Sequence, residues 1–404
     1  MFVSRDSVAF WGAAAALILT YAASAAPVPL YETWRSVDGL SYNDLSLSAV
    51  VYFAGAVSAL VIFGRISDYL GRRPVAILAM LLNAVACLLF LTVNRAEPLI
   101  AGRLLQGLAS GLASTAMAAW IVDTVKPSHS KLPALLISTS PLAGLSLGSL
   151  GGGSLISFAP YPRTLVFVIS VLLMIISIFV LIYGQESVQR RPGLFRSLRP
   201  AFGLPASGKP WYPLAAVVFT CTWSMGGFYQ AFGPVIAAQY LHSTSAIAAA
   251  VVFASYMLPS LLGSTLANKV TPGRAMIIGM LTFMLAIIAA VSALYAGVLV
   301  PFLIASAFAG AAQGATMNAG IRGLMTGASA AERAGTFSVI YATAYTGAAV
   351  PTLIVGRLTS HFSLLQLAAA YALLAIGGFM LVCRLLALKI RNENPVENQP
   401  ENEA

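Results

Sequence analysis

The chain has 404 residues, of which 59% are hydrophobic and only 9% are charged, and its mean hydropathy is +0.85. Soluble domains carry roughly 25% charged residues, so this composition excludes a soluble globular protein and indicates one that crosses a membrane many times. The net charge of +10 does not indicate nucleic-acid binding, because Lys and Arg fall in the gaps between apolar runs and form no basic stripe with interleaved aromatic residues.

Apolar runs long enough to span a bilayer recur along the whole chain. A spanning helix needs about 20 mostly apolar residues. The first run is longer than the apolar part of a usual signal peptide and many runs follow it, so it is expected to be a retained helix. Twelve helices are expected, at residues 8–29, 43–64, 74–93, 98–122, 132–157, 164–184, 211–235, 244–267, 274–293, 296–321, 334–357 and 364–388.

The basic residues predict the orientation of these helices. Lys and Arg favour cytoplasmic loops. If the N-terminus is cytoplasmic, the outer segments hold only Arg35, Arg95, Arg163 and Arg357, and nearly all other Lys and Arg fall on the cytoplasmic side. The charge distribution therefore predicts an even number of spans, with both termini in the cytoplasm.

The longest internal break divides the predicted helices into six and six. We expect a six-helix bundle at 1–184, a basic cytoplasmic linker at 185–210, a second bundle at 211–390 and a disordered polar tail at 391–404. "RLLQG" at 103–107 in the first half has a counterpart in "GAAQG" in the second. Repeated six-helix halves are typical of one class of secondary transporter.

Three motifs suggest a family. The pattern G-x-x-x-D-[RK]-x-G-R-[RK] between the second and third helices is matched by Gly64, Asp68, Gly71, Arg72 and Arg73, with Tyr69 at the usual basic position. The pattern R-x-x-Q-G in the fourth helix is matched by Arg103, Gln106 and Gly107. The pattern G-x-x-x-G-P-x-x-G-G in the fifth is matched in part by Gly144, Gly148, Gly151 and Gly152, with Ser149 replacing the proline.

On these motifs the chain resembles the major facilitator superfamily, and within it the twelve-helix drug/proton antiporter group. The resemblance implies an all-α membrane protein with twelve transmembrane helices in two six-helix pseudo-repeat bundles. It also implies a multi-pass protein of the plasma (inner) membrane that works by alternating access.

The loop at 64–73 is expected to act as a gate. Asp68 can face the positive N-terminal end of a neighbouring helix, which in the family is the eleventh. Gly64 would allow close helix packing and Gly71 a tight turn. Arg72 and Arg73 would anchor the loop in the cytoplasm. The alternative is that these are ordinary cytoplasmic charges with an acidic neighbour.

Arg103 lies well inside a span, so its costly charge should face the bundle interior. The resemblance implies a role in proton coupling, with Gln106 one turn away on the same face. The alternative is a structural arginine bonded to carbonyl groups. Among the acids, Glu32 is the candidate proton carrier, whereas Asp44 follows Ser41 by three and suits a helix cap.

The substrate is expected near the midplane between the halves, among apolar and aromatic walls with few polar groups. The candidate residues in the middle of spans are Tyr21, Tyr52, Trp120, Trp223, Tyr229, Gln230, Tyr256, Gln313, Asn318, Tyr341 and Tyr345. Their bias toward aromatic rings and neutral amides favours a bulky, fairly apolar substrate over a sugar phosphate.

The motifs and the resemblance that they carry imply proton-coupled export of small amphipathic compounds. The alternative is uptake or facilitated transport of an organic nutrient or metabolite. A receptor or enzyme is less favoured, since His129, His242 and His361 are scattered and no nucleophile-base cluster or metal-ligand spacing is present. We expect a monomer that uses protons as the coupling ion, with no metal, no cofactor and no nucleic-acid partner.

Overall fold

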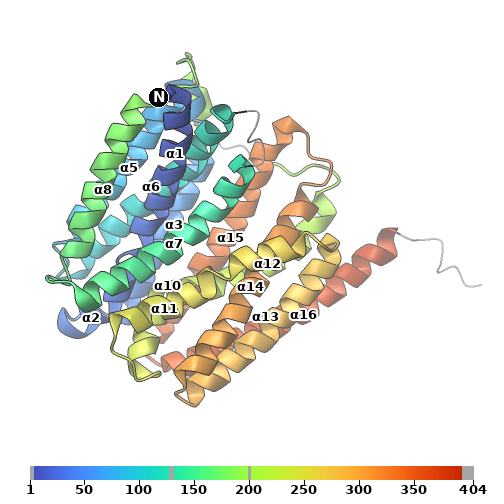
Figure 1. Cartoon of the computed structure of the whole chain (residues 1–404). Helices are drawn as coiled ribbons and strands as arrows, with labels where there is room; N and C mark the ends of the chain where they lie inside the picture. Colours follow the sequence, from blue (N-terminus) through green and yellow to red (C-terminus); the bar gives the residue numbers. More distant parts are fainter. Residues whose placement is uncertain (1–3, 127–131, 199–201, 394–404) are drawn as a thin grey trace, which may run out of the picture.

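The computed structural model describes residues 4–126, 132–198 and 202–393, and within these ranges the regular elements are helices (Figure 1). The first half contains α1 (Arg5–Ala25), η1 (Val28–Leu30), α2 (Tyr31–Val37), α3 (Tyr42–Phe63), α4 (Ser67–Leu70), α5 (Arg72–Phe90), α6 (Ala96–Asp123), α7 (Leu132–Phe158) and α8 (Leu165–Tyr183). The second half follows α9 (Leu194–Ser197) and η3 (Lys209–Trp211). It contains α10 (Tyr212–Gln239), α11 (Ala246–Met257), α12 (Ser260–Ala267), α13 (Pro272–Tyr295), α14 (Leu299–Leu324), α15 (Ala330–Leu358) and α16 (Leu364–Glu393).

Two expected spans are interrupted, and proline is the cause in both. The first span was expected to run to residue 29, but α1 ends at Ala25 and the short helices η1 and α2 follow. The eighth was expected as one helix over 244–267, but it breaks into α11 and α12 at Pro259. Proline has no N–H to donate and its ring clashes with the preceding turn, so a helix kinks or ends there.

Eleven helical segments of the described chain are long and apolar enough to cross a membrane. The 28-residue α10 occupies the place of the expected seventh span but is not among the eleven. Most of its residues are buried, including Thr222, Ser224 and Gln230. Because α10 packs against protein on nearly all sides, it needs less hydropathy than a lipid-facing helix, and the count of twelve spans stays a prediction.

Close packing at glycine relates the two halves. A Cβ atom at Gly107 of α6 would lie 2.1 Å from the carbonyl oxygen of Tyr52, and one at Gly314 of α14 would lie 1.9 Å from that of Ser260. Only glycine allows helices to approach so closely. The two glycines hold the same place in the "RLLQG" and "GAAQG" segments, so the repeat seen in the sequence corresponds to equivalent helix contacts in the two halves.

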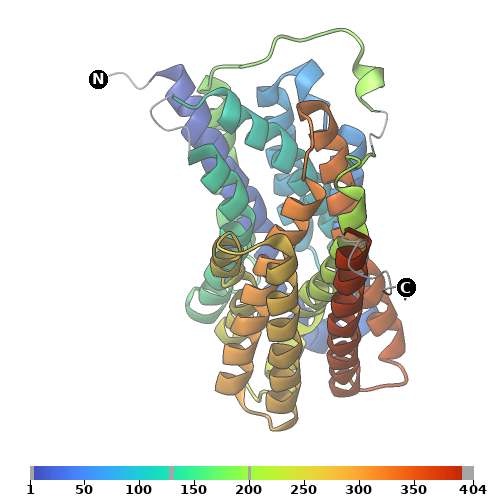
Figure 2. The same cartoon turned by 90° about the vertical axis from the view of Figure 1, so that its right-hand side faces the viewer.

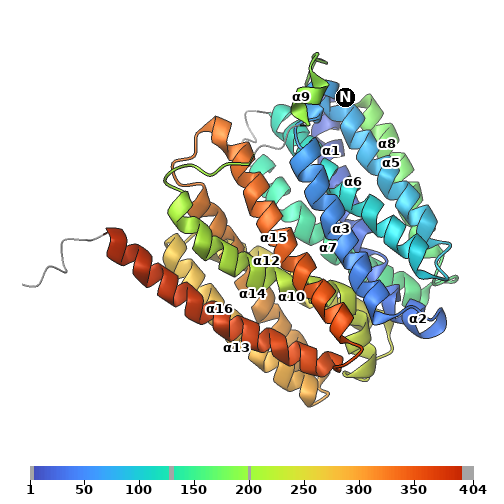
Figure 3. The same ribbon diagram turned by 180° about the vertical axis from the view of Figure 1, so that it is seen from behind.

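The halves meet through α3 and α7 on one side and α10, α11 and α15 on the other. We call the end that holds residues 64–73 the Arg72 end and the opposite end the Tyr42 end. At the Tyr42 end, the Tyr42 hydroxyl donates to Oε1 of Gln239 at 2.9 Å, and the Tyr42 ring lies 6.5 Å from that of Phe232. Gly356 of α15 lies directly against Ser46 of α3. Figures 1 and 3 show the two sets of helices diverging from these contacts toward the beginning of α1 and the end of α16.

The segment after α8 crosses over the Arg72 end on its way to the second half (Figure 2). Most of the tail predicted to be disordered, residues 394–404, lies outside the described residues, and α16 continues to Glu393. The connection between the halves therefore lies at the same end as the loop 64–73, where it contacts that loop.

Candidate functional site

Five of the predicted substrate residues come together where the halves meet, and we call them the central aromatic cluster: Tyr21 of α1, Tyr52 of α3, Trp223 of α10, and Tyr341 and Tyr345 of α15. The Tyr345 ring lies edge-on to Trp223 with centroids 5.1 Å apart and is stacked on Tyr341 at 6.0 Å. The Tyr21 hydroxyl is close enough to Tyr52 and Tyr341 to interact with them electrostatically. The cluster therefore draws on both halves.

The other predicted substrate residues lie elsewhere. Tyr229 and Tyr256 stack at 4.8 Å inside the second half, where the Tyr256 hydroxyl donates to the Thr222 carbonyl at 2.6 Å. Gln313 accepts from the Ser260 hydroxyl at 3.1 Å and Gln230 is buried on α10. At the Arg72 end, Trp120 Nε1 donates to the Gln185 carbonyl at 2.9 Å, and Asn318 accepts from Arg322 at 2.9 Å. The Trp120 bond holds the segment after α8, and the other contacts show packing within the second half.

Arg103 is fully buried beside the central aromatic cluster. Its Nη1 donates to the Ser24 carbonyl at 2.6 Å and to Gln106 Oε1 at 2.8 Å. Its guanidinium lies 4.4 Å from the centroid of the Tyr52 ring, a cation–π contact. Nε and Nη2 are buried without a hydrogen-bond partner. The bond to the Ser24 carbonyl agrees with the alternative that Arg103 is a structural arginine bonded to carbonyl groups. The contact with Tyr52 places its charge next to the candidate substrate site.

The end of α1 explains why the Arg103–Gln106 pair binds there. Gln106 Nε2 donates to the Ala23 carbonyl at 2.7 Å. In a continuous helix that carbonyl would accept from the residue four positions on, but this residue is Pro27, which has no N–H. Side chains from α6 thus satisfy carbonyl groups that the break in α1 leaves free. The spacing of Ala23 and Pro27 is the sequence feature that indicates this need.

The loop 64–73 forms a charge network within the first half. Arg72 pairs with Asp68 at 2.5 Å and with Asp123 of α6 at 3.1 Å, and it donates to Ser67 Oγ at 2.7 Å. The Asp68 side chain is 47% exposed. In this conformation the carboxylate therefore binds its own loop, and its expected interaction with the eleventh helix remains a prediction.

Glu186, which the sequence analysis missed, caps α5 from the segment after α8. Its carboxylate accepts the backbone N–H of Arg72 at 2.8 Å and of Arg73 at 3.0 Å. Gly71 has φ of 103°, and a Cβ there would lie 2.5 Å from Glu186 Oε2. Glycine is thus needed both for the turn and for the approach of the carboxylate. A contact between residues more than a hundred positions apart has no local sequence signal.

We expect Glu186→Gln to lower the stability of the protein by about 1 kcal/mol, because a charged cap at a helix N-terminus is lost. Thermal unfolding of the purified protein in detergent measures the effect. Gln189→Ala is the control, since Gln189 is exposed, lies in the same segment as Glu186 and belongs to no helix. Equal melting temperatures for the two variants would contradict the capping role.

Glu32, the candidate proton carrier, lies on α2 at the Tyr42 end. It accepts from Arg35 Nε at 2.8 Å and Nη2 at 2.7 Å, and its side chain is 20% exposed. The Arg35 guanidinium in turn lies 5.2 Å from the centroid of the Tyr42 ring, whose hydroxyl reaches the second half. The nearby Asp44 forms a capping box with Ser41, which confirms that prediction.

Three of the four glycines of the fifth expected span, which is α7, pack against the first helix. A Cβ at Gly144 or Gly148 would lie 2.5 or 1.8 Å from a carbonyl oxygen of α1, and one at Gly152 would lie 2.9 Å from that of Ala26, the C-cap of α1. A Cβ at Gly151 would meet nothing within 4 Å. Ser149, at the position of the expected proline, donates to the Ala250 carbonyl of α11 at 3.3 Å. Helix α7 therefore uses one face for α1 and another for the opposite half.

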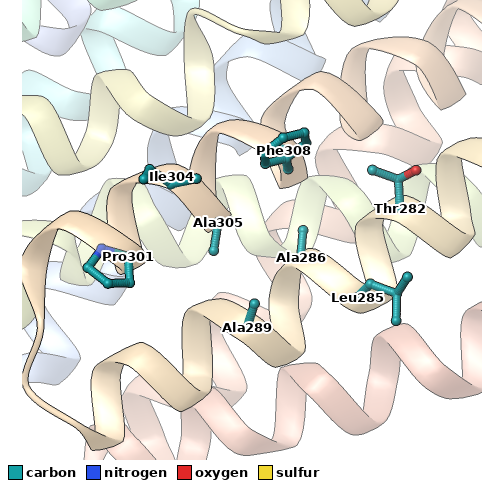
Figure 4. Close-up of a pocket in the computed structure, with 8 residues that line it drawn as sticks. All are labelled: Thr282, Leu285, Ala286, Ala289, Pro301, Ile304, Ala305 and Phe308. Atoms are coloured by element: carbon teal, nitrogen blue, oxygen red, sulfur yellow. The ribbon is translucent and has the colours of Figure 1, made fainter.

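A groove of about 510 Å³ lies between α13 and α14, outside the central aromatic cluster (Figure 4). It is lined by Leu285, Ile304 and Phe308, each more than half exposed, with Pro301 and small residues between them. Its apolar, exposed lining fits contact with lipid, and Thr282 is its one polar side chain.

The helical fold agrees with comparisons of the chain to known proteins. The sequence model of the Major Facilitator Superfamily matches residues 13–258. Over 87 residues, 22% of each chain, the sequence is 36% identical to the Multidrug resistance protein MdtL of Klebsiella pneumoniae subsp. pneumoniae. Over 115 residues, 28% of each chain, it is 35% identical to the Multidrug transporter MdfA of Yersinia pestis bv. Antiqua. The matched segments thus span less than a third of the curated relatives.

Two solved structures share the fold over nearly the whole chain. The peptide transporter POT in complex with alafosfalin aligns with a TM-score of 0.71 and 15% identity, over 95% of this chain and 94% of that one. The nucleoside transporter NupG aligns with a TM-score of 0.70 and 12% identity, over 94% of this chain and 99% of that one. At such low identity the likeness concerns the fold alone.

Proposed function

Because the chain belongs to the major facilitator superfamily, and is thus a multi-pass membrane transporter rather than an enzyme, we propose that it exports small amphipathic compounds in exchange for protons. In this proposal, residues 1–184 and 211–390 are two bundles that rock against each other in the plasma membrane, and the protein works as a monomer. The names of MdtL, a multidrug resistance protein, and MdfA, a multidrug transporter, support a drug-like substrate.

The central aromatic cluster is the observation that carries the proposed substrate class. Its members come from α1, α3, α10 and α15, so a molecule bound there touches both halves and senses their relative movement. Aromatic walls with a few hydroxyl and indole donors suit a bulky, fairly apolar molecule that carries a polar group. Tyr341 and Trp223 are half-buried, which supports access to this surface.

The arrangement of the halves supports an inward-open state. They are joined at the Tyr42 end by the bond from Tyr42 to Gln239 and by the contact of Gly356 with Ser46, and they diverge toward the Arg72 end. We propose that the Arg72 end faces the cytoplasm, as its basic loops favour. The Asp68–Arg72 network would then be the open form of the gate formed by the loop 64–73, and Asp68 would bind the second half once this end closes.

Proton coupling is proposed to use Glu32, Arg103 and Gln106. Protonation of Glu32 would remove its ion pair with Arg35 and free the group that holds the Tyr42 ring. Arg103 and Gln106 bind the end of the same α1 that leads into α2. A change at Glu32 can therefore act on the connection between the outer contact and the central cluster.

One observation favours the alternative, uptake or facilitated transport. Glu32 lies at the Tyr42 end in a bidentate pair, and the other acids of the described spans also lie at helix ends. An exchanger without an acid at its centre has no simple group on which proton and substrate compete. The direction and the coupling thus need a direct test.

Flux in proteoliposomes separates the two functions. The full chain is reconstituted with an imposed pH gradient and presented with a panel of dyes, antibiotics and metabolites, while internal pH is recorded. We expect substrate movement that raises proton flow in the opposite direction. Proton flow in the same direction as the substrate, or flux indifferent to the gradient, would contradict export by proton exchange and favour the alternative.

A further inference from the structure

Acidic and basic side chains occupy different places in the described membrane-spanning segments. The acidic side chains lie at helix ends or in loops, and most bind close neighbours: Glu32 binds Arg35, Asp38 binds Arg163, Asp68 and Asp123 bind Arg72, Glu97 binds Arg95, Asp44 and Glu332 cap their own helices, and Glu186 caps α5. Asp6 is exposed in the first turn of α1. None of these described acids belongs to the central aromatic cluster.

The opposite sign is present beside that cluster. Arg103 is 0% exposed, and its partners in the described residues are neutral: a backbone carbonyl, the Gln106 amide and the Tyr52 ring. Two of its nitrogens have no hydrogen-bond partner. A buried guanidinium that no carboxylate neutralises produces a positive potential around it. Because water and ions are excluded there, this potential is screened much less than that of an exposed charge.

Tyr52 connects this charge to the place where the halves meet. One face of its ring covers the guanidinium at 4.4 Å, and the same residue lies within electrostatic reach of Tyr21 and Tyr345. Its neighbour Phe53 contacts Tyr345 across the interface at 5.8 Å. A molecule bound among these rings is therefore separated from Arg103 by about one aromatic ring.

The cluster also offers an unused donor. Trp223 Nε1 is buried and has no hydrogen-bond partner in the structure, although its ring packs edge-on against Tyr345. An indole N–H can only donate. It therefore suits an acceptor such as a carbonyl or carboxylate oxygen and offers nothing to an ammonium group.

We propose that the central site takes aryl amphiphiles that carry a carbonyl or carboxylate group and discriminates against cations of the same shape. The inference rests on the proposed function as an exporter of amphipathic compounds and adds the sign of the substrate's charge. Arg103 acts through its field, with Tyr52 between it and the ligand, while Trp223 supplies the direct hydrogen bond.

A series of three ligands that differ only in charge tests the inference. 4-Phenylbutyrate, 4-phenylbutanamide and 4-phenylbutylammonium are titrated by calorimetry into the purified full chain in lipid nanodiscs. We expect the carboxylate and the amide to bind at least about tenfold more tightly than the ammonium, which corresponds to about 1.4 kcal/mol. Equal or tighter binding of the ammonium, or binding of none of the three, would overturn the proposal.

Two variants assign the effect to its causes. Arg103→Gln removes the charge and should lower the carboxylate-to-ammonium ratio at least about threefold, leaving the preference that Trp223 supplies, with a smaller effect on the amide. Trp223→Phe removes only the donor, so it should weaken the carboxylate and the amide together by about tenfold and leave the ammonium unchanged. If Arg103→Gln keeps the parent's ratio, or Trp223→Phe leaves the amide unaffected, the assignment is wrong.

Failure of this inference is distinguishable from failure of the proposed function. Flux of only the cationic members of the panel in proteoliposomes would uphold export and overturn the charge preference. Binding with the predicted preference but uptake in place of export would uphold the charge preference and contradict the proposed direction.

Discussion

Gly148→Val is expected to prevent the chain from accumulating as a folded protein. A Cβ at residue 148 would lie 1.8 Å from the carbonyl oxygen of Ala22 and 2.5 Å from its carbonyl carbon. Both are backbone atoms of α1, so no side chain can turn aside to make room. Overpacking in a core costs typically 1–3 kcal/mol, and displacement of one helix from another costs at least that. The loss is a large fraction of the about 5–15 kcal/mol by which a folded domain is typically stable.

Gly151→Val is the matched control, because it places the same side chain on the same helix. Gly151 is exposed, and a Cβ there meets nothing within 4 Å. We expect Gly151→Val to give parental yields, because the added side chain meets no neighbour. Both variants carry the same change in helix propensity, so a difference in yield reports the clash with α1. Size-exclusion chromatography of a fluorescent fusion measures the monodisperse yield. Similar yields for the two variants would show that α1 and α7 do not pack as the structure has them.

The positions of the long helices were predictable because a helix that spans the bilayer needs about 20 mostly apolar residues, and hydropathy measures this directly. The expected spans at 43–64 and 164–184 differ from α3 and α8 by only a residue at each end. The break at Pro259 was not predicted, because hydropathy does not register a missing N–H, although residues 246–267 still form one segment long and apolar enough to span the membrane. The helix expected at 211–235 is present as α10, although its buried polar residues lower its hydropathy.

The candidate site was predictable only in part, for a similar reason. An aromatic residue in the middle of a span can face either the centre or the packed interior of its own half, and the sequence pattern is the same. Tyr345 faces the centre, whereas Tyr229 packs against Tyr256 and Ser306 within the second half. Contacts set by the tertiary fold alone, such as Glu186 with the N-terminus of α5, have no periodicity that could indicate them.

The two halves differ at the position of Arg103. Its counterpart in "GAAQG" is Gly310, where a Cβ would lie 2.0 Å from the Tyr256 carbonyl oxygen. In the second half this position thus serves close helix packing, and in the first it carries a buried charge. The break at the end of α1 gives Arg103 a structural task that the continuous α10 does not present in the second half, so its proposed role in transport needs a direct test.

Arg103→Ala is expected to abolish the acceleration of flux by a pH gradient. The change removes the bonds to Ser24 and Gln106 and leaves their oxygen atoms unsatisfied, at a cost of about 1–3 kcal/mol each. If that energy couples α1 to α6 during transport, gradient-driven flux should fall at least about tenfold. Flux is measured in proteoliposomes with and without the gradient. Arg95→Ala, at a residue 73% exposed, is the control.

A purely structural arginine predicts a different outcome for the same pair of measurements. Loss of helix packing alone would lower the melting temperature and reduce flux by the same factor with and without the gradient. Loss of coupling would equalise the two fluxes in Arg103→Ala, while the parent and Arg95→Ala keep their stimulation. The ratio of the two fluxes therefore separates the alternatives even if the variant is less stable, and an unchanged ratio would contradict the coupling role.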